Sequence, residues 1–196
     1  MARIATLNRT TSETAIRLTL NLDGAGTAET TTGIGFLDHM LTALARHALF
    51  DLKVEAQGDL HVDYHHTTED VGIVLGAAMR EALGDKRGIR RFGHALVPMD
   101  EALAEAAVDL SGRPLLVWDV AFHRPKVGEM DTELFEEFFR ALANNALLTL
   151  HVTARAGRNA HHVAEACFKA VARALRAAVE PDPRACGAIP STKGAL

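Results

Sequence analysis

The chain of 196 residues has few aromatic side chains, little cysteine and a small net charge. One Trp, one Tyr and eight Phe exclude recognition built mainly on stacking, and a net charge of −4 offers no basic face to nucleic acid or an anionic membrane. Cys167 and Cys186 form no paired motif, which favours a reducing cytoplasm. No apolar run approaches the roughly 20 residues of a membrane span. We also expect no signal peptide, since residues 1–18 lack its apolar core.

Histidine is the residue that is present in excess, and it is clustered. The stretch HVDYHHTTED holds His61, His65, His66, Glu69 and Asp70. The same HHxxE pattern returns in NAHHVAEACF, with His161, His162 and Glu165. Two copies of so unusual a polar motif indicate either a repeated site or a repeated structure.

The two motifs belong to an internal duplication. A shift of 98 residues pairs segment 43–56 with segment 141–154, with eight identities in fourteen positions. A shift of 96 residues superimposes the two HHxxE motifs. We therefore expect two repeats, about 3–90 and 91–182, and a C-terminal tail at 183–196.

Hydrophobic periodicity indicates the same order of elements in both repeats. Alternating apolar residues predict strands at 13–22, 51–57, 113–122 and 148–154, helical spacing predicts helices at 36–49, 65–83, 132–147 and 161–179, and 90–112 reads as a hairpin. Strands and helices mixed over short loops predict an α+β fold of two pseudo-symmetric lobes, each a small, mostly antiparallel sheet packed on a helix pair. The lobes should form one compact unit over 1–196.

Adjacent histidines on a helix indicate two metal ions. Residues four apart share a face, while neighbours diverge by about 100°. His65 can therefore bind one ion together with Glu69, and the second repeat can bind another in the same way. For His66 to be a ligand it must reach a different ion from His65. The simplest closed arrangement holds each ion by a His–Glu pair from one repeat and a lone His from the other.

The ligand types narrow the choice of metal. His39, in GFLDHML, adds another imidazole beside an acid. Nitrogen and oxygen ligands without thiolate favour Mn, Fe or Zn, and the spare carboxylates put Mn first. The alternative interpretation of each HHxxE motif by itself is a solvated, polar helix face.

A known family shares these motifs. GFLDHML, DYHHTTEDVGI, RRFG, PMDEAL, DLSGRP, AHHVAEACFKA and PSTKG resemble, in order and spacing, the imidazoleglycerol-phosphate dehydratases of histidine biosynthesis, over about residues 3–196. The resemblance implies a cytoplasmic lyase with two Mn²⁺ per active site, which removes water from D-erythro-imidazoleglycerol phosphate to give imidazoleacetol phosphate. It also implies a homo-oligomer of 24 subunits, with a small phosphorylated imidazole as substrate and neither nucleic acid nor membrane as partner.

The resemblance further implies a ligand set. One Mn²⁺ would take His39, His66, His161 and Glu165, and the other would take His65, Glu69, His162 and one more ligand. The family often has EHFF where this chain reads EEFF, so Glu137 stands at the position of that ligand. The duplication aligns Glu137 with His39, which favours a ligand role for a carboxylate that differs from the family pattern.

The remaining residues of the family site complete the expectation. Glu13, in RTTSETAIRL, matches the acid/base carboxylate, and by itself would read as an exposed strand residue. The phosphate contacts match Arg91, Arg113, Ser191 and Lys193. The tail with PSTKG is then either disordered or a loop that closes over substrate. Four further residues lie near these motifs without a separate role: Arg9, His47, Asp100 and Glu101.

Two other kinds of protein fit part of the pattern. A dinuclear metallohydrolase also activates water at paired His and Glu sites, and a metal-storage or scaffold protein needs only the histidine clusters. The phosphate contacts argue against storage, and Glu13 argues against hydrolysis.

Overall fold

The two halves of the chain have the same order of strands and helices. The computed structural model describes residues 3–196. The first half contains β1 (Ile4–Thr10), β2 (Thr14–Asn21), β3 (Ala28–Thr31), α1 (Gly35–Ala48), β4 (Asp51–Gly58) and α2 (His65–Leu83). The second half contains β5 (Phe92–Met99), β6 (Ala102–Asp109), β7 (Leu115–Asp119), the small hairpin β8 (Lys126–Val127) and β9 (Met130–Asp131), α3 (Leu134–Ala146), β10 (Thr149–Ala156) and α4 (Ala160–Val179).

Each half forms a four-stranded sheet of the same topology. The strand orders are β1-β2-β4-β3 and β5-β6-β10-β7. In both sheets the first three strands pair antiparallel and the last pair is parallel, β3 with β4 and β7 with β10. A parallel pair needs a crossover connection, which α1 and α3 supply. The predicted α+β fold with two pseudo-symmetric, mostly antiparallel sheets is confirmed.

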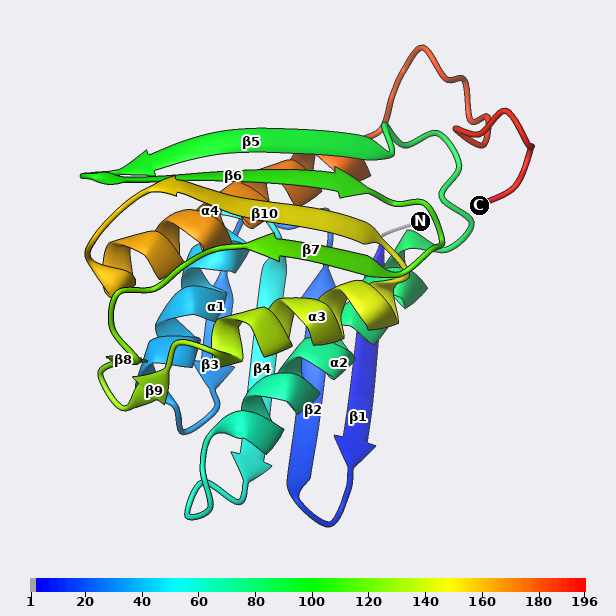
Figure 1. Ribbon diagram of the computed structural model, residues 1–196. Coiled ribbons are helices and arrows are strands. Elements are labelled where there is room, and N and C mark those ends of the chain that lie inside the picture. Colours follow the sequence, from blue (N-terminus) through cyan, green and yellow to red (C-terminus); the bar gives the residue numbers. More distant parts are fainter. Residues whose placement is uncertain (1–2) are drawn as a thin grey trace.

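The four helices lie between the two sheets (Figure 1). Helix α2 packs on α3 and α1 packs on α4, so helices of one half contact helices of the other. One continuous apolar core runs from the first sheet through the helices to the second. Within residues 3–196, no helix has the length and apolar character needed to cross a membrane.

Two glycines allow the backbones of α2 and α3 to approach closely. A methyl group at Gly72 would lie 2.7 Å from the Phe138 carbonyl oxygen, and one at Gly76 would lie 2.5 Å from that of Leu142. Because both obstacles are backbone atoms, neither can move aside cheaply. This contact holds the two repeats in one register.

The structure differs from the predicted elements at the edges of the sheets. The predicted strand 113–122 is shorter, because β7 pairs with β10 only over Leu115–Asp119. The sequence patterns do not predict strands β1, β3, β8 and β9. The last three have two to four residues each, too few for a clear alternation.

We predict that Gly76→Ala destabilises the protein. Alanine is favoured over glycine in a helix by about 0.5–1 kcal/mol, but the new methyl group must displace α3, and overpacking of this kind costs about 1–3 kcal/mol. Urea denaturation followed by circular dichroism should show a net loss of stability. Gly35→Ala is the control, since no atom lies within 4 Å of the added methyl group there. Equal stability of the two variants would contradict the close-packing interpretation.

Candidate metal centre

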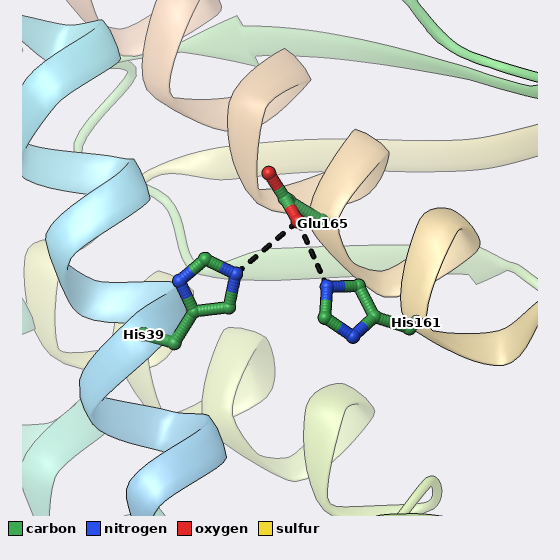
Figure 2. A group of neighbouring side chains, drawn as sticks. All are labelled: His39, His161 and Glu165. Carbon is green, nitrogen blue, oxygen red and sulfur yellow. Dashed lines mark hydrogen bonds and ion pairs between the residues drawn. The ribbon is translucent and has the colours of Figure 1, made fainter.

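Two imidazoles and a carboxylate meet where α1 crosses α4 (Figure 2). The Oε2 atom of Glu165 lies 3.2 Å from Nε2 of His39 and 3.0 Å from Nε2 of His161. The three ligand atoms all lie within 4.8 Å of one another. His39 comes from the first turns of α1, and the other two residues are four apart on α4. The structure thus brings together three of the four residues expected to hold one ion.

The charge of Glu165 suits a metal ligand. The carboxylate is buried, which opposes its ionisation, but hydrogen bonds from Lys169, His161 and His39 outweigh burial and lower the pKa of Glu165. The Nζ atom of Lys169 lies 2.7 Å from Oε1, the oxygen that faces away from the imidazoles. Lys169 therefore occupies Oε1, and Oε2 is the oxygen that faces the two imidazoles. Two nitrogens and one oxygen without thiolate form a donor set that fits Mn, Fe or Zn.

The equivalent residues of the other repeat are nearby but not closed into a cluster. Nε2 of His65 lies 3.9 Å from Oε2 of Glu69, and both side chains are about half-exposed. Glu137 lies at the end of the first turn of α3, and its Oε2 atom is 3.7 Å from Nε of Arg140. The Gly72 contact with Phe138 brings the turn of Glu137 alongside the turn of Glu69. Within residues 3–196, His39, His161 and Glu165 are the only set of three or more His, Cys, Asp or Glu side chains whose ligand atoms all lie within 4.8 Å of one another.

The second histidine of each motif points away from both groups. Nδ1 of His66 lies 2.9 Å from Oδ2 of Asp59, and Nδ1 of His162 lies 2.7 Å from Oε2 of Glu101. Each imidazole therefore turns toward its own repeat, as expected from its divergence of about 100° from its neighbour. A single chain does not form the closed arrangement in which each ion takes a lone His from the other repeat.

The carboxylate partners of these histidines are held as anions. The hydrogen bond from His162, with those from the N–H groups of Asn159 and Arg158, lowers the pKa of Glu101 to about 2. The hydrogen bond with His66 lowers the pKa of Asp59. The same two bonds raise the pKa of His66 and of His162.

The residues expected to contact phosphate gather at the other end of α4. Arg91 binds Asp109 through Nε at 2.7 Å and Nη2 at 3.1 Å, and its Nη1 donates to the Pro190 carbonyl at 2.8 Å. Arg113 lies 3.9 Å from the same Asp109 carboxylate. In the tail, the Lys193 N–H donates to Ser191 Oγ at 3.2 Å. Asp109 thereby joins the two arginines, and Arg91 connects them to the tail at Pro190.

This group is far from the His39 cluster. The N–H of Arg91 donates to the carbonyl of Ala178, near the end of α4, whereas His161 lies in its first turn. Seventeen residues of helix separate those positions, which is about 25 Å at 1.5 Å per residue. In Figure 1 the tail and the start of α4 lie at opposite ends of the upper sheet.

Glu13 lies in the turn between β1 and β2. Its Oε1 atom is 3.9 Å from Nε2 of His66, and its side chain is 49% exposed. Its backbone is tied on both sides, because its N–H donates to Thr11 Oγ1 and its carbonyl accepts from the Asp59 N–H. The backbone of Glu13 is thus held in place, while its carboxylate remains exposed.

Sequence reasoning gave no role to several residues near the site. Asp70 is buried and binds Arg9, and it accepts a hydrogen bond of 2.5 Å from Thr14 Oγ1. Arg9 therefore links β1 to α2, and its partner is Asp70 and not the set of residues expected to contact phosphate. Lys169 could have been noticed as a cation four residues after Glu165. Asp59 carried no signal, since a Gly-Asp pair reads as an ordinary turn.

The duplicated fold and the His–His–Glu cluster place a candidate metal site between two repeats of one chain, an arrangement compatible with a metal-dependent enzyme. A family model described as imidazoleglycerol-phosphate dehydratase matches residues 32–175. A protein of that name from Granulibacter bethesdensis is 74% identical over 196 residues, covering 100% of both chains. One from Gluconacetobacter diazotrophicus is 70% identical over 100% of this chain and 98% of its own. The chain belongs to the imidazoleglycerol-phosphate dehydratase family, and it is an enzyme of the hydro-lyase class.

Solved structures agree with this assignment. The structure of the dehydratase from Staphylococcus aureus has a TM-score of 0.83 and 44% identity, covering 91% of this chain and 99% of that one. The structure from Pyrococcus furiosus has a TM-score of 0.84 and 38% identity, covering 97% and 100%. The resemblance predicted from the sequence motifs is confirmed.

We predict that Glu137→Ala binds one metal ion fewer per chain, because Glu137 stands where the family pattern has a ligand. Glu137→His should keep both ions and shift selectivity toward Zn, Ni or Co, since nitrogen is a softer ligand than oxygen. Elemental analysis after gel filtration measures both effects. Glu136→Ala is the control, as Glu136 pairs with Arg140 on the same turn. Two tightly held ions in Glu137→Ala would remove Glu137 from the ligand set.

Proposed function

We propose that the protein catalyses the Mn²⁺-dependent removal of water from D-erythro-imidazoleglycerol phosphate, giving imidazoleacetol phosphate, as a step of histidine biosynthesis in the cytoplasm. The observation that carries the proposal is the His39–His161–Glu165 cluster in a chain of this family. Both repeats act as one catalytic unit, with two ions per active site. The donor set fits Mn²⁺, although Fe and Zn share it.

The chemistry explains why such a site is needed. The proton at C2 of the glycerol chain is not acidic, because no carbonyl stands beside it before water is lost. Bound Mn²⁺ would act as a Lewis acid toward the imidazole nitrogens of the substrate. Glu13 then serves as the acid/base group, because its carboxylate is exposed and its backbone is fixed. Within residues 3–196 no hydrogen bond engages its carboxylate, which leaves that group available to move a proton.

The separation of the two residue groups supports a homo-oligomer. The phosphate contacts lie about 25 Å from the cluster along α4. The five bonds that join the ring to the phosphorus span less than two residues of extended backbone, roughly 7 Å. One chain therefore cannot hold both ends of a substrate with these two groups. We propose that neighbouring copies complete each site, in an assembly that the family resemblance makes a 24-mer.

The same reasoning accounts for His66 and His162. Neither joins a ligand cluster in its own chain. Nε2 of His66 lies 3.9 Å from Glu13 Oε1 and Nε2 of His162 lies 3.7 Å from Asp100 Oδ2, so neither nitrogen is within hydrogen-bond distance of those carboxylates. We assign them as ligands of ions held mainly by a neighbouring copy. His66 would thus be the fourth ligand of the His39–His161–Glu165 cluster of a neighbouring copy. His162 would join the His65–Glu69 pair of a neighbouring copy.

We predict that Glu13→Gln abolishes turnover while metal content stays unchanged, because the amide cannot accept the proton. The measurement is formation of the enolised product from imidazoleglycerol phosphate at alkaline pH by the Mn²⁺-loaded protein. Release of inorganic phosphate from generic phosphate esters by the parent protein, without dehydration, would instead support a metallohydrolase. Near-normal turnover by Glu13→Gln would remove Glu13 from catalysis.

A second prediction concerns the tail. Removal of Ser191–Leu196 should spare folding and metal content, because the Arg91 contact with Pro190 is retained. It should weaken substrate binding, because Ser191 and Lys193 are lost as phosphate contacts. A raised KM with metal content unchanged is the expected result. An unchanged KM and kcat would show that the tail does not close over substrate.

A further inference from the structure

Two glutamates occupy equivalent hairpin positions in the two repeats. Glu13 directly precedes Thr14, the first residue of β2, and Glu101 directly precedes Ala102, the first residue of β6. Thr14 and Ala102 are both buried, and the inward and outward alternation of the two strands matches from there on. Each glutamate also faces the second histidine of its own repeat. The duplication has therefore placed the same carboxylate twice.

The two carboxylates contact different nitrogens. Glu101 binds Nδ1 of His162 at 2.7 Å through Oε2, and its Oε1 accepts the N–H groups of Arg158 at 3.1 Å and Asn159 at 2.8 Å. Glu13 approaches Nε2 of His66 at 3.9 Å, beyond hydrogen-bond distance. Glu101 is thus held in place, whereas Glu13 is not.

Asp59 makes for His66 the contact that Glu101 makes for His162. Its Oδ2 lies 2.9 Å from Nδ1 of His66, so the Nδ1 position is already occupied in the first repeat. The shift of 98 that aligns the strands pairs Asp59 with Gly157. Gly157 has φ +142°, and a Cβ there would lie 2.4 Å from Cγ2 of Val163. The second repeat therefore has no room for a carboxylate at that place.

We propose that Asp59 and Glu101 are positioning residues, each of which accepts the Nδ1–H of the second histidine of its motif and leaves Nε2 unprotonated for a metal ion. Because Asp59 performs this task in the first repeat, Glu13 is released for proton transfer. The inference rests on the proposed function in taking His66 and His162 as ligands.

The physical basis is the tautomer of imidazole. A carboxylate can only accept a hydrogen bond, so the nitrogen that faces it carries the proton. A neutral imidazole has one N–H, and the other nitrogen then has a free lone pair. Metal-binding histidines commonly donate their second nitrogen to a carboxylate, and loss of that partner typically costs 10–100-fold in metal affinity.

Glu101→Gln is a sharp test because it inverts the hydrogen bond. The amide oxygen is required by the two backbone N–H groups, so the NH₂ group must face Nδ1. That nitrogen would then have to accept, which places the proton on Nε2 and blocks it as a ligand. We expect the affinity for one ion per chain to fall 10–100-fold. Glu101→Asp, which remains an acceptor, should recover part of it.

The experiment uses the full-length, assembled protein stripped of metal. Mn²⁺ affinity is measured against a competing chelator, and Co²⁺ absorption reports the ligand set directly. Asp59→Ala should weaken the ion that His66 ligates, whereas Glu13→Gln should leave both affinities unchanged. Glu105→Gln is the matched control, because Glu105 is a glutamate of β6 that pairs with Arg155.

The outcomes separate this role from others. Wild-type Mn²⁺ affinity and Co²⁺ spectra in both Glu101→Gln and Asp59→Ala would overturn the proposal. So would a lower melting temperature of the metal-free variants with an unchanged Co²⁺ spectrum, since that pattern marks a purely structural role. If the parent binds two ions but does not dehydrate imidazoleglycerol phosphate, the proposed function fails while the positioning result stands.

Discussion

The contact between helices of opposite repeats is the constraint on which the candidate metal cluster depends. His39 lies on α1, and His161 and Glu165 lie on α4, so the cluster exists only where those helices cross. The backbone approach of α3 to Gly72 and Gly76 fixes the companion pair of helices in the same layer. Because packed interiors have few voids and little freedom to shift, this arrangement holds the three ligand atoms together without help from a loop.

The two repeats differ in the residues that they place at equivalent positions of the site. One repeat presents an imidazole where the other presents a carboxylate, as with His39 and Glu137. One repeat orients its second histidine from the turn after β4, and the other does so from the β5–β6 hairpin. The position equivalent to Asp59 in the second repeat is Gly157, which has no side chain to contact His162. Equivalent backbones have thus been kept while the chemistry of individual positions diverged.

Burial and charge act together at Glu165. A buried carboxylate is costly unless it is paired, and here Lys169 pairs one oxygen while two imidazoles face the other. The same pairing keeps the residue anionic and aims a single oxygen at the cluster. Glu13 has the opposite environment: its side chain is 49% exposed and lies 3.9 Å from His66, which is compatible with the proton-transfer role that we propose for it.

Much of the fold could be predicted from the sequence, because periodicity and repetition are local properties. The shift of 98 aligns Leu49 with Leu147, and both residues end their helices in the left-handed region, at φ 57° and 54°. The spacing of His161 and Glu165 was likewise sufficient to place them on one helix face. The short strands β3, β8 and β9 could not be predicted, since so few residues show no period.

The sequence by itself determined the order of the elements, the duplication and the residue types available to bind metal. Only the tertiary structure decided which of those residues meet. It joined His39 to the α4 pair, turned His66 toward Asp59, and separated Arg91 from the cluster by the length of a helix. The physical reason is that spacing along a helix sets the direction of a side chain, whereas its partner depends on which other element packs against that face.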